Sequence, residues 1–378
     1  MVAIDPKTGG ILALVSNPGY DPNLFVTGIS SEQYQSMVNS LQTPLFNRAV
    51  NGQYSPGSTF KPVIGLAGLS NGVISWEEEI KDYGWFKLPN QDRIYRDWSW
   101  RQGGGGGQGI VNMNRAIYRS SNIYFYDLAT RLSIDQIGSF ARQFGIGEQF
   151  AVDVADASSG LMPDPIWKQG VKGEVWYPGD NVNVGIGQGD VLVTPLQLAT
   201  MTSVIANRGK VIRPRLLNPV EGGQLPLEFD PPQPLPDVMG PSPDDWERMV
   251  NSMEDVVHRG NRGFKDGFGQ NGTAWAYIGR DIDYMMAGTS GTAQVVEIKQ
   301  GEEYDEELLD EFKRKHAWFV AFAPADDPMI ALAVLVENGG GGSSVAAPVA
   351  REVIDYYLLP KLDVADRETL AVDLADRQ

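Results

Sequence analysis

"YSPGSTFKP", residues 54–62, places a serine and a lysine three residues apart, Ser58 and Lys61, directly behind a Pro-Gly turn. Pro62 has no backbone N–H and its ring clashes with a preceding turn, so it belongs at or near the start of a helix. Ser58 is therefore predicted at the N-terminal end of that helix, where unpaired N–H groups and the dipole favour negative charge. Because residues three apart lie on one helix face, with Cβ atoms about 5–6 Å apart, the Lys61 amine can reach the Ser58 hydroxyl.

This pair has two interpretations: a nucleophile with its base, or two polar residues at the start of an ordinary surface helix. Ser-x-x-Lys occurs by chance in many proteins, so the spacing alone favours the second interpretation. A lysine base must have its pKa lowered from about 10.4 to roughly 7–8, by burial or by a neighbouring positive charge. If Lys61 is catalytic, it is therefore expected to be buried.

The composition excludes several classes of protein. The chain has 378 residues, of which 42% are hydrophobic and 21% charged, values typical of globular proteins. Its net charge of -17 argues against a nucleic-acid partner, because phosphate binding needs a basic face. No apolar run reaches the roughly 18 residues of a membrane span, and no signal peptide is apparent. The lack of cysteine excludes a thiol nucleophile and fits an oxidising compartment.

The two histidines, His258 and His316, narrow the chemistry further. They are too few for a histidine-rich metal cluster, and a Ser-His-Asp triad would need one of them. His316 opens "HAWFVAFAP", a predicted buried strand, and His258 ends a predicted helix. Both are interpreted as structural, so an attacking serine is expected to use a lysine as its base.

Strand patterns occur at both ends of the chain, with helical patterns between them. A hairpin is predicted at 2–4 and 11–15, and two further strands at 316–324 and 329–340. Helical spacing begins at residue 58 and recurs at 111–132, 194–209, 244–260 and 344–360. These patterns predict one sheet formed by both chain ends, with helices packed on its faces. The glycine-rich segments "RQGGGGGQG" and "GIGQGD" lack the features of phosphate or dinucleotide sites and are interpreted as tight turns.

Two further motifs favour the interpretation of Ser58 and Lys61 as a nucleophile and its base. "RSSNIYF", residues 119–125, places Ser120 two residues before Asn122. "AGTSGTAQVV", residues 287–296, is strand-like, with glycines where a backbone must approach closely. Ser-x-x-Lys, Ser-Asp-Asn and Lys-Thr-Gly are the signature of penicillin-binding proteins and class A β-lactamases. The order and spacing match that signature, with the third motif read as Ser290-Gly291-Thr292.

The chain resembles the class B penicillin-binding proteins, and within them the penicillin-binding protein 2 group of the Gram-negative elongation machinery. The resemblance covers nearly the whole chain and is carried by "DPKTGGILALVSNPGYDPNLF", "FNRAVNGQYSPGSTFKP", "YRDW", "GIGQGDVLVTPLQLA", "GTSGTAQVV", "HAWFVAFAP" and "VENGG". It implies an α/β fold of the α+β type, shared with serine β-lactamases, in which both chain ends form an antiparallel sheet. Helices would cover both faces of that sheet, and an all-helical subdomain would complete the fold.

The same resemblance implies a domain organisation. Residues 1–378 would be one transpeptidase domain, with a sheet subdomain at about 1–50 and 275–360 and a helical subdomain at about 58–260. In the family, a membrane anchor and a pedestal precede this domain, which acts on the periplasmic side of the inner membrane. A membrane glycosyltransferase and scaffold proteins of the elongation complex are the expected protein partners.

The resemblance also implies a role for each motif residue. Ser58 would be the acylated nucleophile, Lys61 its base, and Ser120 a proton relay to the leaving amine. Asn122 would hold the lysine amine and the substrate amide. The N–H groups of Ser58 and Thr292 would form the oxyanion hole, within a substrate-binding segment comprising Thr289, Ser290, Gly291 and Thr292.

The implied reaction is D,D-transpeptidation of peptidoglycan stem peptides, with weak carboxypeptidase activity as a side reaction. The serine would attack the D-Ala-D-Ala bond of one stem, release D-Ala and pass the acyl group to an amine of a neighbouring stem. β-Lactams would mimic the donor and leave a slowly hydrolysed acyl-enzyme. Covalent catalysis of this kind needs no metal or organic cofactor.

Two departures from the family pattern stand out. Thr289 occupies the position of the lysine that opens the third motif, which removes a cation expected to attract the donor carboxylate. Some family members carry zinc on two aspartates, a histidine and a cysteine. Asp82 and Asp97 match the first pair, but Gln108 and Ser121 stand where the histidine and cysteine would be, so no structural zinc is predicted.

Two alternatives to a transpeptidase remain open from the sequence. A serine β-lactamase would share the fold but needs a base for the deacylating water, and no motif identifies one. A non-catalytic scaffold or β-lactam sensor is favoured only by Thr289.

Overall fold

The computed structural model describes residues 1–100, 106–151, 153–154, 156–217, 235–260, 271–295 and 309–362. The first five residues of the glycine-rich segment at 101–109, and the last residue of the motif at 287–296, lie outside this part of the chain. None of the helices within it is both long and apolar enough to cross a bilayer.

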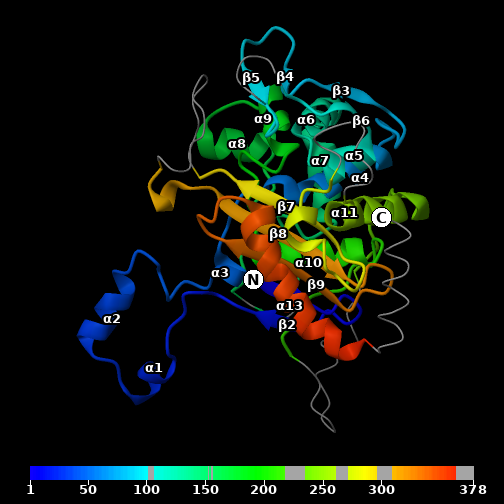
Figure 1. The fold of residues 1–378 in the computed structure, drawn as a ribbon. Helices are drawn as coiled ribbons and strands as arrows, with labels where there is room; N and C mark the ends of the chain where they lie inside the picture. The colour runs from blue at the N-terminus through cyan, green and yellow to red at the C-terminus, as the bar shows by residue number, and fades with distance from the viewer. Residues whose placement is uncertain are drawn as a thin grey trace.

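A five-stranded antiparallel sheet lies at the centre of the molecule (Figure 1). Its strand order is β2-β1-β9-β8-β7. The strands are β1 Val2–Ile4, β2 Ile11–Leu14, β7 Ala287–Ala293, β8 His316–Ala323 and β9 Ile330–Val336. Because β1 pairs with both β2 and β9, the N-terminal hairpin extends the sheet made by the C-terminal strands. The predicted sheet from both chain ends is therefore confirmed.

Helices cover both faces of this sheet, which explains its long apolar strands. Nearly all residues of β8 are buried, as expected for a strand that is covered on both sides. Helix α10, Pro195–Ala206, packs against β9, β1 and β8, and every one of its residues is buried. Helix α13, Ala347–Leu358, packs on β8 and β9 and crosses the opposite face in Figure 1.

The middle of the chain forms the helical part of the fold. Its helices are α3 Arg48–Asn51, α4 Lys61–Ser70, α5 Met113–Tyr118, α6 Asn122–Arg131, α7 Ile134–Arg142, α8 Pro165–Lys172, α9 Pro178–Val184, α11 Pro243–His258 and α12 Trp275–Ile278. Helices α1, Asn23–Thr27, and α2, Ser31–Val38, lie on an excursion that projects from the body (Figure 1). Two small ladders pair β3, Ile80–Asp82, with β6, Gly109–Val111, and β4, Trp85–Lys87, with β5, Ile94–Arg96. Short turns η1 Gly57–Phe60, η2 Glu311–Lys313, η3 Gly342–Ala346 and η4 Leu359–Lys361 complete the elements.

The continuous helix predicted at 111–132 is wrong. Helices α5 and α6 are separate, and Ser120 between them has a φ of 54°, which no α-helix accommodates. The Ser121 side chain accepts a hydrogen bond from the N–H of Tyr124 and so caps a new helix. A serine that caps a helix start competes with helix continuation, and periodicity alone does not detect this.

The two histidines have structural hydrogen bonds, as the sequence suggested. Nδ1 of His316 accepts from the N–H of Asn338 at 2.9 Å, and Nε2 of His258 accepts from the N–H of Met286 at 2.9 Å. Burial lowers the pKa of the His316 imidazole. A ring nitrogen that accepts a backbone N–H bond is unprotonated, so both side chains serve as neutral acceptors in these contacts.

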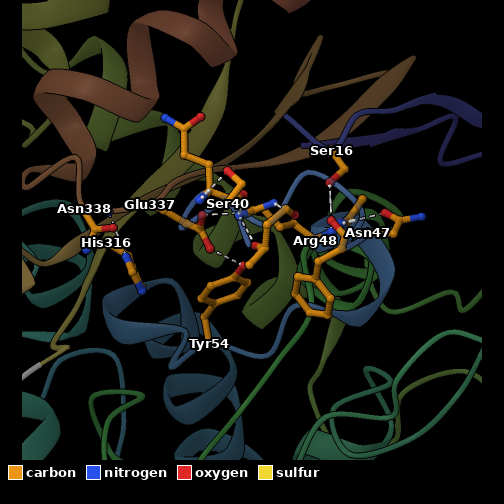
Figure 2. Close-up of polar contacts among 12 residues, drawn as sticks. Ser16, Ser40, Asn47, Arg48, Tyr54, His316, Glu337 and Asn338 are labelled. Atoms are coloured by element: carbon orange, nitrogen blue, oxygen red, sulfur yellow. Dashed lines mark hydrogen bonds and ion pairs between the residues drawn. The ribbon is translucent and has the colours of Figure 1, made fainter. Parts of the chain in front are cut away.

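A polar network joins the segment before the serine turn to the end of β9 (Figure 2). The Glu337 carboxylate accepts from Arg48 Nε at 2.7 Å and from the Tyr54 hydroxyl at 2.7 Å. Arg48 is 9% exposed and also donates to the Gln42 carbonyl oxygen at 2.6 Å. The network therefore attaches Tyr54, four residues before Ser58, to the central sheet.

Replacing Glu337 by alanine is expected to lower the free energy of unfolding by about 2–3 kcal/mol, because its ion pair with Arg48 is only partly buried. The substitution leaves the buried Arg48 guanidinium without its anionic partner, and an uncompensated buried charge is costly. Glu337→Gln keeps one acceptor oxygen and should lose less. Urea denaturation measures both, with the exposed Glu32→Ala as a surface control expected within about 0.5 kcal/mol of wild type. A Glu337→Ala value equal to that control would contradict the role of the network.

Candidate active site

Ser58 lies in η1, a 3₁₀ turn that leads directly into α4. Lys61 is the first residue of α4 and Pro62 the second, so Ser58 is at the helix entrance, as predicted, although in a 3₁₀ turn. Gly57 before it has a φ of 57°, and a Cβ there would lie 2.7 Å from the carbonyl oxygen of Thr292. Glycine is needed at this position because the third motif passes so close to the serine turn.

Lys61 is buried, being 2% exposed, as a catalytic lysine requires. Its Nζ donates to the Ser120 carbonyl oxygen at 2.8 Å, to Asn122 Oδ1 at 2.8 Å and to Ser120 Oγ at 3.1 Å. Burial lowers the pKa of the Lys61 amine to about 7, and the negative charges of Asp97 and Asp82 oppose that shift. The lowering expected from the sequence is thus caused by burial.

The contacts of Lys61 suit a neutral amine. The Ser120 carbonyl oxygen and Asn122 Oδ1 can only accept, and a neutral amine has two N–H groups to give them. The third contact is a hydroxyl, which can either donate or accept. The amine lone pair is then available for a hydroxyl proton, which is what a general base needs.

The junction of α5 and α6 directs Ser120 and Asn122 toward Lys61. Ser120 adopts the left-handed region, where non-glycine residues are uncommon and strained. Its backbone N–H is held by the Ile117 carbonyl at 3.0 Å. This conformation aims both the carbonyl and the hydroxyl of Ser120 at one atom, Lys61 Nζ. The structure therefore brings together three of the four predicted catalytic residues by hydrogen bonds and places Ser58 one turn before Lys61.

Strand β7 brings the third motif to the serine turn. A Cβ on Gly291 would lie 2.7 Å from the Pro56 carbonyl oxygen, so the strand and the turn are in direct backbone contact. Ser290 and Thr292 are partly exposed, whereas Thr289 is 3% exposed. The predicted substrate-binding segment thus lies beside Ser58, and position 289 contributes a neutral hydroxyl where the family pattern has a cation.

Sequence reasoning missed Gln188. The segment "GIGQGD" is a tight turn, with positive φ at Gly187 and Gly189, as expected. The turn also has a second role: Gln188 Nε2 donates to the Thr292 carbonyl oxygen at 2.9 Å, and the Gly187 carbonyl accepts from the N–H of Gly57 at 2.8 Å. It therefore holds the serine turn and the third motif in one arrangement. No local pattern signals this contact, because the Gln188–Thr292 pair is separated by 104 residues.

The four residues that were compared with the family's zinc ligands, Asp82, Asp97, Gln108 and Ser121, lie together near Lys61. Ser121 Oγ donates to Asp82 Oδ2 at 2.7 Å, and Gln108 Nε2 lies 3.4 Å from Asp97 Oδ1 as a donor. Zinc in proteins prefers imidazole and thiolate ligands, and here those two positions present hydrogen-bond donors to the carboxylates. The residues present do not fit a zinc ion.

The sequence profile described as "Penicillin binding protein transpeptidase domain" matches residues 1–355. That match covers most of the chain, and the three motifs that define the site fall within it. The chain belongs to this family. The antiparallel sheet with helices on both faces is the fold that its structural relatives share.

Individual relatives are similar over almost the whole chain. "Peptidoglycan D,D-transpeptidase MrdA" of Acinetobacter baumannii is 43% identical over 364 residues, 96% of this chain and 51% of the relative. Penicillin-binding protein 2 of Pseudomonas aeruginosa, solved in complex with WCK 5153, is 44% identical, with a TM-score of 0.81 over 95% of this chain and 73% of the other. Penicillin-binding protein 2 of Helicobacter pylori, in complex with MreC, is 30% identical, with a TM-score of 0.78 over 96% of this chain and 60% of the other. The chain spans about half the length of the curated relative from Acinetobacter.

Proposed function

We propose that this protein is a peptidoglycan D,D-transpeptidase of the elongation type and a target of β-lactams. The observation that carries the proposal is the buried amine of Lys61, held by Ser120 and Asn122 one turn from Ser58. A lysine with a pKa of about 7 is half deprotonated near neutral pH and can take a proton from a serine hydroxyl. The similarity to relatives described as D,D-transpeptidases supports the reaction class.

In the proposed acylation, Lys61 Nζ takes the proton of the Ser58 hydroxyl as Oγ attacks the carbonyl carbon of the penultimate D-Ala. The tetrahedral oxyanion is stabilised by the N–H groups of Ser58 and Thr292. The C–N bond then breaks, and a proton passes from Lys61 through Ser120 Oγ to the leaving amine of the terminal D-Ala. An ester remains on Ser58. Transfer reverses these steps, with the amine of a second stem peptide attacking the ester.

The third motif would bind the carboxylate end of the donor. In this assignment the Ser290 and Thr292 hydroxyls are its hydrogen-bond donors, since both are partly exposed beside the serine turn. Gly291 allows the strand to approach Pro56 closely, which keeps the oxyanion donors next to Ser58. The proposed chemistry uses side chains and backbone N–H groups alone.

The domain and cellular context are part of the proposal. Apolar side chains of the sheet and of the helices, such as Phe319 and Phe125, belong to one core, which supports a single transpeptidase domain with the two subdomains predicted above. We place it on the periplasmic side of the inner membrane, on an anchored full-length protein. Scaffold proteins comparable to the MreC bound by the Helicobacter relative, and a membrane glycosyltransferase, would be its partners.

A donor peptide ending in D-Ala-D-Ala, mixed with an amine acceptor, tests the proposed function. A transpeptidase is expected to release D-Ala and to form a new amide with the acceptor, both detectable by mass spectrometry. Turnover of a chromogenic cephalosporin without such transfer would instead identify a β-lactamase. No acylation by either substrate would point to a non-catalytic scaffold.

Thr289→Lys is expected to raise the rate constant of acylation by penicillin. The new cation would attract the substrate carboxylate, and a hydrogen bond to a charged group is worth about 1.5–3 kcal/mol, or on the order of 10- to 150-fold. Stopped-flow acylation measures the effect. The control is Thr27→Lys, which adds the same charge on the exposed α1. An unchanged or lower rate for a folded Thr289→Lys protein would contradict this account of position 289.

A further inference from the structure

A buried polar cluster lies behind the proposed base and has no role in the mechanism above. Its members, Asp82, Asp97, Gln108 and Ser121, are all less than 9% exposed. They come from different elements: Asp82 ends β3, Asp97 follows β5, Gln108 precedes β6 and Ser121 caps α6. Buried carboxylates are costly unless they are fully hydrogen-bonded, so the contacts of the two aspartates indicate what the cluster does.

Asp97 accepts hydrogen bonds on both oxygens. Its Oδ2 accepts from the backbone N–H of Asn122 at 2.7 Å. Its Oδ1 accepts from the N–H and the hydroxyl of Ser99, at 2.9 Å and 2.6 Å, and is 3.4 Å from Gln108 Nε2. Every partner is a donor, which suits a carboxylate. The short hydrogen bond therefore fixes the backbone of Asn122, and the side chain of Asn122 accepts a hydrogen bond from the Lys61 amine.

Asp82 binds the start of the same helix, α6, one residue earlier, at Ser121. Its Oδ2 accepts from the Ser121 hydroxyl at 2.7 Å, and its Oδ1 from the N–H of Gly84 at 2.7 Å. Ser121 Oγ in turn accepts from the N–H of Tyr124. Two carboxylates thus hold the first residues of α6, where the helix dipole favours negative charge. Immediately before these residues is Ser120, in its strained left-handed conformation.

We propose that Asp97, supported by Asp82, is a positioning residue for the base, and that it holds Asn122 and Ser120 around Lys61 Nζ without a metal ion. The proposal rests on the proposed function of Lys61. The bond from Asn122 to Asp97 fixes the backbone of Asn122, so that its side-chain oxygen meets the lysine amine at 2.8 Å. Because Ser120 and Asn122 are separated by one residue, the same restraint maintains the strained conformation of Ser120.

The charge of Asp97 predicts how its removal changes the pH dependence of acylation. Within the part of the chain that the structure describes, the groups whose pKa the Asp97 charge shifts include Lys61, Asp82, Arg119 and Tyr126. The Asp97 charge raises the pKa of the Lys61 amine, against the larger effect of burial. Removing that charge therefore lowers the pKa of the base, and the acid limb of the pH–rate profile moves to lower pH.

Asp97→Asn tests the proposal. An amide cannot accept on both sides, so one donor, at Asn122 or Ser99, loses its partner. We expect the acylation rate constant for penicillin to fall about 10- to 100-fold above pH 8. Non-covalent binding should be nearly unchanged, and the acid limb should lie at lower pH than in wild type. A purely structural defect would lower the rate equally at all pH values.

The matched control is Asp245→Asn. Asp245 accepts a hydrogen bond from the N–H of Ser242 at the start of α11, and Asp97 accepts one from the N–H of Asn122 at the start of α6. The charge of Asp245 is not among those that shift the pKa of Lys61. The control should lower the melting temperature without moving the pH profile. If the wild-type protein is acylated and Asp97→Asn has the same rate and pH profile, the proposal for Asp97 is overturned and the proposed function is not. If the wild-type protein is not acylated, both are overturned.

A second measurement does not depend on the folding of a variant. Dialysis of wild-type protein against a zinc chelator should leave its acylation rate unchanged, and elemental analysis should find no stoichiometric zinc. Loss of acylation on chelation, restored by added zinc, would overturn the inference that hydrogen bonds alone hold this cluster.

Discussion

Ser58→Ala is expected to abolish the penicillin adduct. Wild-type protein incubated with excess penicillin should gain one drug mass, because the proposed function implies an ester on Ser58 that deacylates slowly. Removing the nucleophile of a serine enzyme lowers the rate by about 10⁴-fold or more, so the variant should show no adduct over hours. Intact mass spectrometry measures both proteins directly.

Ser120→Ala is the matched control for this result, because two serines compete for the role of nucleophile. Ser120 Oγ is hydrogen-bonded to Lys61 Nζ at 3.1 Å, and Ser58 is placed by the turn that enters α4. We expect Ser120→Ala to acylate more slowly but to keep an adduct that peptide mapping assigns to Ser58. An adduct mapped to Ser120, or one that persists in Ser58→Ala, would refute the assignment of the nucleophile.

Lys61→Met is expected to lower the acylation rate constant by about 10²–10⁴-fold, the range associated with loss of a general base. Methionine keeps an unbranched side chain in the buried site and cannot take a proton. Lys61→Arg is the second variant, because guanidinium keeps the positive charge but does not deprotonate in proteins. Both should be measured by stopped-flow acylation, with melting curves to establish that each protein folds.

The pH dependence of wild type checks the same role independently of any variant. Burial lowers the pKa of Lys61 to about 7, and in the proposed mechanism the deprotonated amine is the active form. The acylation rate should therefore be half-maximal near pH 7, level off above pH 8, and fall about tenfold for each unit below pH 6. A rate that keeps rising to pH 10 would contradict the lowered pKa of Lys61, and a rate independent of pH between 6 and 8 would contradict its role as the base.

Much of the fold could be predicted from local pattern. The hairpin of β1 and β2, the strands β8 and β9, and the helices α10 and α11 follow from apolar runs, helical spacing and turn residues that lie next to one another in the chain. The three motifs of the site were identified by residue type and spacing. The break between α5 and α6 was missed, because Ser121 caps a helix in the middle of an otherwise helical pattern.

By itself, the sequence determined the three motifs and most of the elements that carry them, because motifs are read from residue type and spacing and local backbone conformation depends mainly on near neighbours. Only the tertiary structure decided how the site works. Lys61 meets Ser120 across 59 residues, Asn122 meets Asp97 across 25, and Gln188 meets Thr292 across 104. The pKa of a lysine depends on everything packed around its amine. The burial that lowers the pKa of Lys61 is therefore a property of the folded chain and of no single segment within it.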